Sequence, residues 1–83
     1  MEIEKILEER GKTHGDFTEN AEISQRLKDL VRPTASRRTD VQNEALDMIL
    51  HKISRICVGD PNHQDNYDDI AGYAKLVSDR LEK

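Results

Sequence analysis

The chain has 83 residues, of which 35% are apolar and 36% charged, and its formal net charge is −4. This length holds a single core, so we expect one domain over residues 1–83. Apolar runs of at most three residues exclude both a membrane span of about 20 residues and a signal peptide. The acidic charge argues against nucleic acid as a partner, and the single cysteine, Cys57, excludes an internal disulfide and predicts a reducing, cytoplasmic compartment.

Helical periodicity begins near the N-terminus, where residues 2–10 are expected to form a short helix that ends at Gly11. The next segment, GKTHGDF at 11–17, has the composition of a turn. Asp16 is positioned to cap a second helix, which stops near Pro33. Residues 32–39 have almost no apolar anchors, and we expect them to form a loop.

Two further helices follow in the second half of the chain. The first is capped by Thr39 or Asp40 and continues to about Val58, and the last begins near Gln64 and continues to the C-terminus. We therefore expect an all-α fold, a small helical bundle of three main helices plus a short N-terminal helix. Because so small a core rarely supplies more than about 3–5 kcal/mol, we expect oligomerisation to complete it, as a homodimer or larger homo-oligomer.

The helix at 40–58 is the most informative element. Its apolar residues cover an arc of about 200°, twice what a surface helix needs, so we expect this helix to be central and Cys57 to be buried. The remaining polar stripe places four side chains on one face at helical spacing: Glu44, Asp47, His51 and Arg55. Lys52 lies at the edge of the apolar arc.

Carboxylates gather in two places, and together they predict a cation site. Glu44 and Asp47 are three residues apart, and a second group opens the last helix: Asp65, Asp68 and Asp69. Oxygen ligands of this kind suit Mg²⁺, which commonly bridges carboxylates and substrate phosphates. In a simple hairpin the two groups lie about 15–20 Å apart, so the predicted site needs a second subunit or a less simple hinge.

Cationic side chains near these carboxylates predict a phosphate-binding role. Lys52 and Arg55 follow Asp47 by about one and two turns, and His14 and His51 are the other residues that we expect to meet a nucleotide. A purely structural interpretation is the alternative. The polar face of the helix at 40–58 would then form ion pairs in solvent, Lys52 would extend its ammonium group to water, and the aspartates at 65–69 would stabilise the start of the last helix.

The acidic pattern resembles the two-part signature of the all-α nucleoside triphosphate pyrophosphatases, the MazG-like and dimeric dUTPase superfamily. That superfamily favours Glu-x-x-Glu and then Glu-x-x-Asp, and this chain departs from it at Asp47 and Asp65. The resemblance implies an oligomeric helical bundle that binds Mg²⁺ and cleaves nucleotides to a monophosphate and pyrophosphate.

Three longer segments, at 11–17, 44–56 and 65–76, resemble a family of small phage and prophage proteins. This second resemblance implies a phage-encoded accessory protein in the cytoplasm of a bacterial host. Two functions follow as hypotheses. One is a Mg²⁺-dependent nucleotide-binding protein or pyrophosphohydrolase, and the other is a non-catalytic oligomeric helical module that binds a host or phage protein as an inhibitor or regulator.

Overall fold

A computed structural model describes residues 2–81. That part of the chain contains four α-helices, one 3₁₀ helix and no strand: α1 (Glu2–His14), α2 (Phe17–Val31), η1 (Arg32–Arg37), α3 (Asp40–Val58) and α4 (Gln64–Ser78). The all-α prediction is confirmed. The last helix ends at Ser78, earlier than expected, and residues 82–83 at the end of that prediction lie outside the described part.

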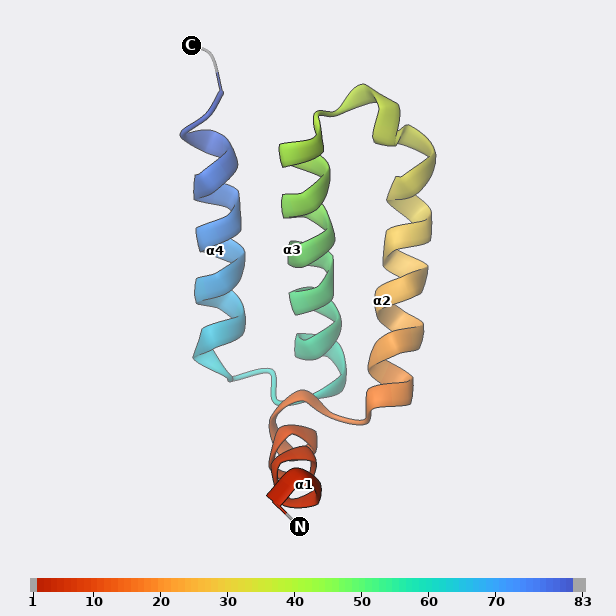
Figure 1. Cartoon of the computed structure of the whole chain (residues 1–83), viewed down its shortest axis with the longest axis vertical. Helices are drawn as coiled ribbons and strands as arrows, with labels where there is room; N and C mark the ends of the chain where they lie inside the picture. The colour runs from red at the N-terminus through yellow and green to blue at the C-terminus, as the bar shows by residue number, and fades with distance from the viewer. Residues whose placement is uncertain (1, 82–83) are drawn as a thin grey trace.

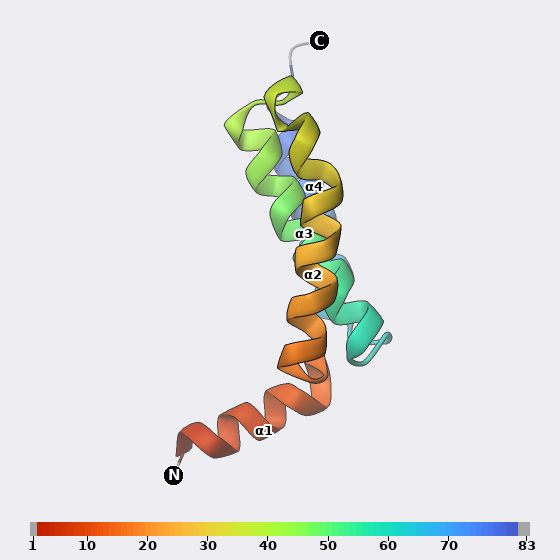
Figure 2. The same cartoon turned by 90° about the vertical axis from the view of Figure 1, so that its right-hand side faces the viewer.

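The three long helices form a single layer. α3 lies in the middle and contacts α2 on one side and α4 on the other, with successive helices antiparallel (Figure 1). Turned by 90°, the layer is thin, and α1 leaves its lower end at a steep angle (Figure 2). The molecule measures 49 × 25 × 23 Å. The expectation that the helix at 40–58 is central is confirmed.

The first helix differs from its prediction because it continues through Gly11 to His14. A glycine inside a helix costs only about 1 kcal/mol, whereas the turn that ends a helix often requires a positive φ. Gly15 has that backbone, with φ 82°, and its N–H donates to the Gly11 carbonyl at 2.9 Å. Most of the GKTHGDF segment is therefore the last turn of α1 rather than a loop.

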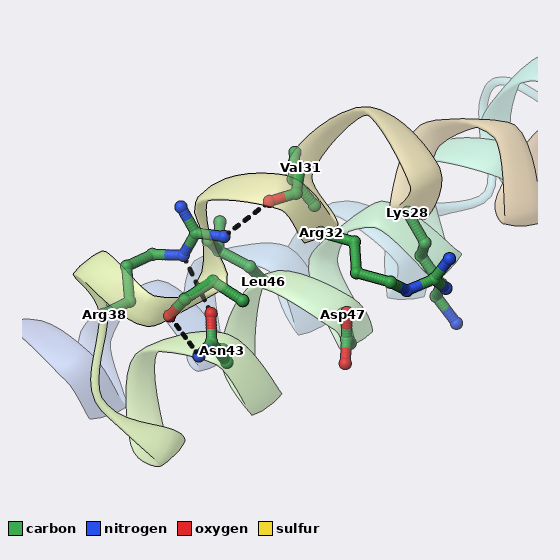
Figure 3. A pocket seen from close by; sticks show the side chains of 8 residues that line it. Lys28, Val31, Arg32, Arg38, Asn43, Leu46 and Asp47 are labelled. Atoms are coloured by element: carbon green, nitrogen blue, oxygen red, sulfur yellow. Dashed lines mark hydrogen bonds between the residues drawn. The ribbon is translucent and has the colours of Figure 1, made fainter.

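The helix starts follow the predicted caps. The Asp16 carboxylate accepts from the Glu19 N–H at 3.0 Å. Thr39 and Gln42 form a reciprocal capping box at the start of α3. The expected loop at 32–39 is largely the 3₁₀ helix η1, because the Arg38 guanidinium holds it closed: Nη2 donates to the Val31 carbonyl at 2.9 Å and Nε to Asn43 at 2.8 Å (Figure 3).

The buried part of the molecule is small and mostly polar. Among residues 2–81, Ala45 is the one buried apolar residue, beside four buried polar ones: Asn20, Ser24, Ser54 and Asn66. The Ser54 hydroxyl donates to the Asn20 side chain and so joins α3 to α2. Cys57 is exposed, contrary to expectation, because the apolar arc of α3 is wider than its two neighbours cover. No helix in the described range is long and apolar enough to cross a membrane.

Candidate anion-binding site

The end of α1 packs closely against the end of α3. The Asp60 N–H donates to the Thr13 carbonyl at 2.8 Å. A Cβ on Gly15 would lie 2.5 Å from Val58, and a Cβ on Gly59 would meet the backbone of Thr13 and His14. Glycine is therefore required on both sides of this contact, because any larger residue would push the two chain segments apart. The junction of α1 and α3, comprising residues 13–16 and 58–60, places the His14 side chain beside α3.

A cavity of about 590 Å³ opens next to this junction, between α1, the start of α2 and the C-terminal half of α3. Its walls combine two arginines and two histidines with one acid, Asp16, and with apolar and polar residues: Leu7, Arg10, Gly11, His14, Gly15, Asp16, Phe17, Asn20, His51 and Arg55. The cavity brings together three residues that the sequence predicted as phosphate-binding, namely His14, His51 and Arg55. Because these come from two helices far apart in the chain, only the fold could unite them.

The electrostatics of this cavity favour an anion. The pKa of His14 is lowered, first by burial and then by the positive charge of Arg55 and other nearby cationic groups. Burial also lowers the pKa of His51, and Arg55 and Lys28 add to the effect. Burial is the larger cause of both pKa shifts and the neighbouring cations add to it, and an anion bound there would favour protonation of the two imidazoles.

Two nitrogens beside the cavity are buried without a hydrogen-bond partner. They are Nδ1 of His14 and Nε of Arg55. Buried polar atoms are nearly always paired, and leaving one unpaired costs about 1–3 kcal/mol, more for a charged group. A bound oxyanion would give the Arg55 Nε–H an acceptor. The His14 ring also makes a T-shaped contact with the His63 ring, at 5.6 Å between ring centres.

Lys52 does not line this cavity. Its Nζ lies 3.0 Å from Oδ2 of Asp69 on α4, and its side chain is 12% exposed. The structure therefore pairs a predicted phosphate ligand with a predicted metal ligand. The side of α3 that carries Lys52 faces α4, whereas the side that carries His51 and Arg55 faces α1 and α2.

The predicted metal ligands lie apart from one another in the single chain. Glu44 lines a groove between α3 and α4, and Asp47 lines a hollow of about 180 Å³ near Lys28 and Arg32 (Figure 3). At the start of α4, Asp65 lies 3.7 Å from His63 Nε2, and the Asp68 carboxylate accepts from the Gln64 amide at 3.2 Å.

Within residues 2–81, no group of three or more His, Cys, Asp or Glu side chains could hold a metal ion. The antiparallel hairpin explains this separation. It sets the first turns of α3 beside the end of α4, so the two acidic groups occupy opposite ends of the layer (Figure 1).

Sequence reasoning missed Arg10, which lines the cavity one turn before His14 on the same helix. The i, i+4 spacing of these two residues is visible in the sequence. Ending the first helix at Gly11 hid it. The apolar residues Leu7 and Phe17, which line the same cavity, were missed as well.

Comparisons with known proteins bear on the family and leave the activity open. No curated protein and no solved structure matches the chain at a significant level. A family model described as a domain of unknown function, DUF6378, matches residues 2–81. This match covers nearly the whole chain, and the chain therefore belongs to the DUF6378 family.

Proposed function

We propose that this chain binds the phosphates of a nucleotide in the cavity beside the α1–α3 junction. The observation that carries the proposal is that Arg10, His14, His51 and Arg55 line one cavity, with two buried nitrogens that lack partners. No ion pair joins Arg10 or Arg55 to a carboxylate in the described part of the chain, so their charge is available to a ligand.

The chemistry of the cavity suits a phosphate that carries an organic group. A guanidinium presents a planar fork of donors that matches two phosphate oxygens. Phe17 lines the same cavity and is 82% exposed, so its ring is accessible to a nucleobase. With a volume of about 590 Å³, the cavity falls within the usual range for small-molecule sites.

A role for Mg²⁺ is the second part of the proposal. Its candidate ligands remain the five predicted carboxylates: Glu44, Asp47, Asp65, Asp68 and Asp69. Because the hairpin separates the two groups within one chain, a shared ion would require two subunits to meet. With a bound metal, the reaction that we propose is hydrolysis of a nucleoside triphosphate to a monophosphate and pyrophosphate, in a phage-encoded accessory protein of the host cytoplasm.

The test is binding, measured by calorimetry and thermal shift. Tripolyphosphate and a panel of NTPs and dNTPs are titrated with and without Mg²⁺. Any ligand that prefers the folded state must raise the melting temperature. Arg55→Gln removes a charged donor and should raise Kd about 10- to 100-fold. The matched control is Arg26→Gln, which changes an exposed arginine on α2 outside the cavity and should leave Kd unchanged.

Two results would contradict the proposal. One is equal loss of affinity in Arg55→Gln and Arg26→Gln, which would indicate only a general charge effect. The other is the absence of any shift or hydrolysis across the whole panel.

A non-catalytic oligomeric module is the second candidate, and the exposed apolar surface favours it. Nine large apolar side chains are exposed within residues 2–81, including Ile3, Phe17, Leu30 and Leu76. So much apolar surface on a small protein is typical of an interaction site. This function predicts a stable assembly whose melting temperature does not change with nucleotide or Mg²⁺.

A further inference from the structure

A shallow groove of about 410 Å³ lies between the N-terminal half of α3 and the C-terminal half of α4. Its floor is apolar, and its charged residues are divided between its two sides. The floor is formed by Val41, Ala45, Tyr73, Leu76 and Val77. Acids, Asp40 and Glu44, flank it on α3, and a base, Arg80, flanks it just beyond the end of α4.

These charges have no partner of opposite sign in the described part of the chain. The Arg80 guanidinium donates to the Leu76 carbonyl at 2.8 Å and makes no ion pair. Asp40 and Glu44 make none either. The groove is therefore an apolar strip with unpaired negative charge on one side and unpaired positive charge on the other.

Within residues 2–81, no second layer covers the groove. Val41 is 49% and Leu76 50% exposed, although both lie on the apolar faces of their helices. Helices normally bury such faces against another layer of secondary structure. Here α2, α3 and α4 lie side by side, and α1 extends from the opposite end of the molecule (Figures 1 and 2).

We propose that a second copy of this chain covers the groove, with its two-fold axis parallel to α3 and α4. Such an axis exchanges the two sides of the groove and leaves each residue at the same height along the helices. As a result, α3 packs on α4 of the partner subunit. Glu44 and Asp40 then face Arg80 of the partner subunit, and the same contacts repeat on the other side of the axis. The four helices form a bundle in which every neighbouring pair is antiparallel.

The charges select this axis. A two-fold axis perpendicular to the helices would also stack two layers. It would place each helix over its own copy and reverse positions along the helices, so Arg80 of the partner subunit would lie away from the acids. The acids would then lose their counter-charge. The self-complementary arrangement depends on Glu44 and Arg80 lying at one level, and both do line the same groove.

The first experiment measures the mass of the full chain by light scattering over a range of concentrations, in buffer without Mg²⁺. Wild type should be a dimer. Leu76→Arg places a charge on the groove floor twice in each dimer and should raise the dimer Kd at least about 100-fold. Leu30→Arg is the matched control, because Leu30 is 78% exposed on α2 and does not line the groove. Circular dichroism checks that each variant keeps its helices.

A monomeric wild type would overturn the proposal, and so would a dimer that survives Leu76→Arg. Equal weakening by Leu76→Arg and Leu30→Arg would also overturn it, since the interface would then lie elsewhere.

The second experiment tests the axis and does not depend on Leu76. Glu44→Arg alone and Arg80→Glu alone should each weaken the dimer about tenfold, because each sets like charges against one another. The double variant, Glu44→Arg with Arg80→Glu, should restore the wild-type Kd to within about threefold. Failure of the double variant to recover affinity would exclude this pairing. Anion binding in the cavity beside the α1–α3 junction involves none of these residues, so anion binding and the dimer can each fail alone. Glu44 is also one of the carboxylates proposed for Mg²⁺, so these measurements are made without Mg²⁺.

Discussion

The α1–α3 junction and the α3–α4 groove lie at opposite ends of one small molecule and differ in how completely they are packed. At the junction, two glycines allow backbone to touch backbone, and the Asp60 N–H reaches the Thr13 carbonyl. In the groove, Leu76 and Val41 stay about half exposed, and the charged residues beside them make no ion pair within residues 2–81.

The two regions differ in what they leave without a partner, polar atoms in one and apolar surface in the other. The junction is well packed, and the groups left without a partner at the cavity beside it are polar: the buried Nε of Arg55 and the buried Nδ1 of His14. A small anion can satisfy such atoms. The groove leaves apolar area exposed, and only another macromolecular surface can cover it. This difference is why we propose a ligand at one end of the molecule and a second subunit at the other.

The largest expected effect is at the junction. Gly15→Ala should lower the free energy of unfolding by about 3 kcal/mol, because alanine is strained at φ 82° and its Cβ would collide with Val58. Urea denaturation at one protein concentration measures the change. Gly11→Ala is the control: no atom lies within 4 Å of its added Cβ, so it should be neutral or stabilising. Similar losses in both variants would show that the junction is not tightly packed.

A smaller effect is expected where Lys52 meets Asp69, close to the groove. Lys52→Met keeps the aliphatic stem and removes the charge, and it should lower the free energy of unfolding by about 1 kcal/mol because the ammonium is largely shielded from water. Lys75→Met removes a lysine from the exposed pair with Asp79 and should cost at most about 0.5 kcal/mol. Thermal denaturation compares the two variants. If Lys75→Met proves the more damaging, burial does not strengthen the Lys52 pair.

A still smaller effect is expected at Gly72 on α4. No atom lies within 4 Å of a Cβ added at this glycine. Gly72→Ala should therefore raise the free energy of unfolding by about 0.5–1 kcal/mol, through helix propensity alone. Denaturation of the Leu76→Arg background isolates this effect from subunit association. A loss of stability there would reveal a packing contact within the chain.

The smallest expected effect is the pH dependence of the free energy of unfolding that arises from His14 and His51. Because the pKa values of His14 and His51 are lowered from 6.5, the unfolded chain binds more protons just below that pH than the folded chain does. Stability should therefore be full above about pH 6.5 and fall as the pH drops below it. Denaturation between pH 7.5 and 5.5 measures the fall, which should flatten in His14→Gln.

Sulfate, which stays a dianion throughout that range, should oppose the loss if it binds in the cavity, since it favours the charged imidazoles. A stability that rises on acidification without added anion would contradict the lowered pKa values.

Much of the secondary structure could be predicted from local chemistry. The caps at Asp16 and Thr39 and the stop near Pro33 depend on residues within one turn of each helix end, so they are visible in sequence. The end of α1 could not be placed, since two glycines four residues apart offered alternative stops. Helix α1 is ended by Gly15 rather than by Gly11, and there the chain packs against Val58 and Gly59, more than forty residues away.

The candidate site was predicted only in part, because some of its features are local in the sequence and others depend on long-range packing. His51 and Arg55 lie on one helix face at helical spacing, and the sequence identified that face. Arg10 and the cavity itself depend on the angle at which α1 meets the layer, which no short-range pattern encodes. The acidic residues were grouped by similarity of spacing, whereas the antiparallel hairpin holds the two groups at opposite ends of the layer.

The amino-acid sequence by itself determined that the chain is helical, where most helices begin, and that α3 is central, because periodicity and capping act over a few residues. Only the tertiary structure decided that Arg10 joins His14, His51 and Arg55, that Lys52 pairs with Asp69, and that an apolar groove stays open. These depend on how rigid helices pack against one another, and that packing balances contacts between residues far apart in the chain.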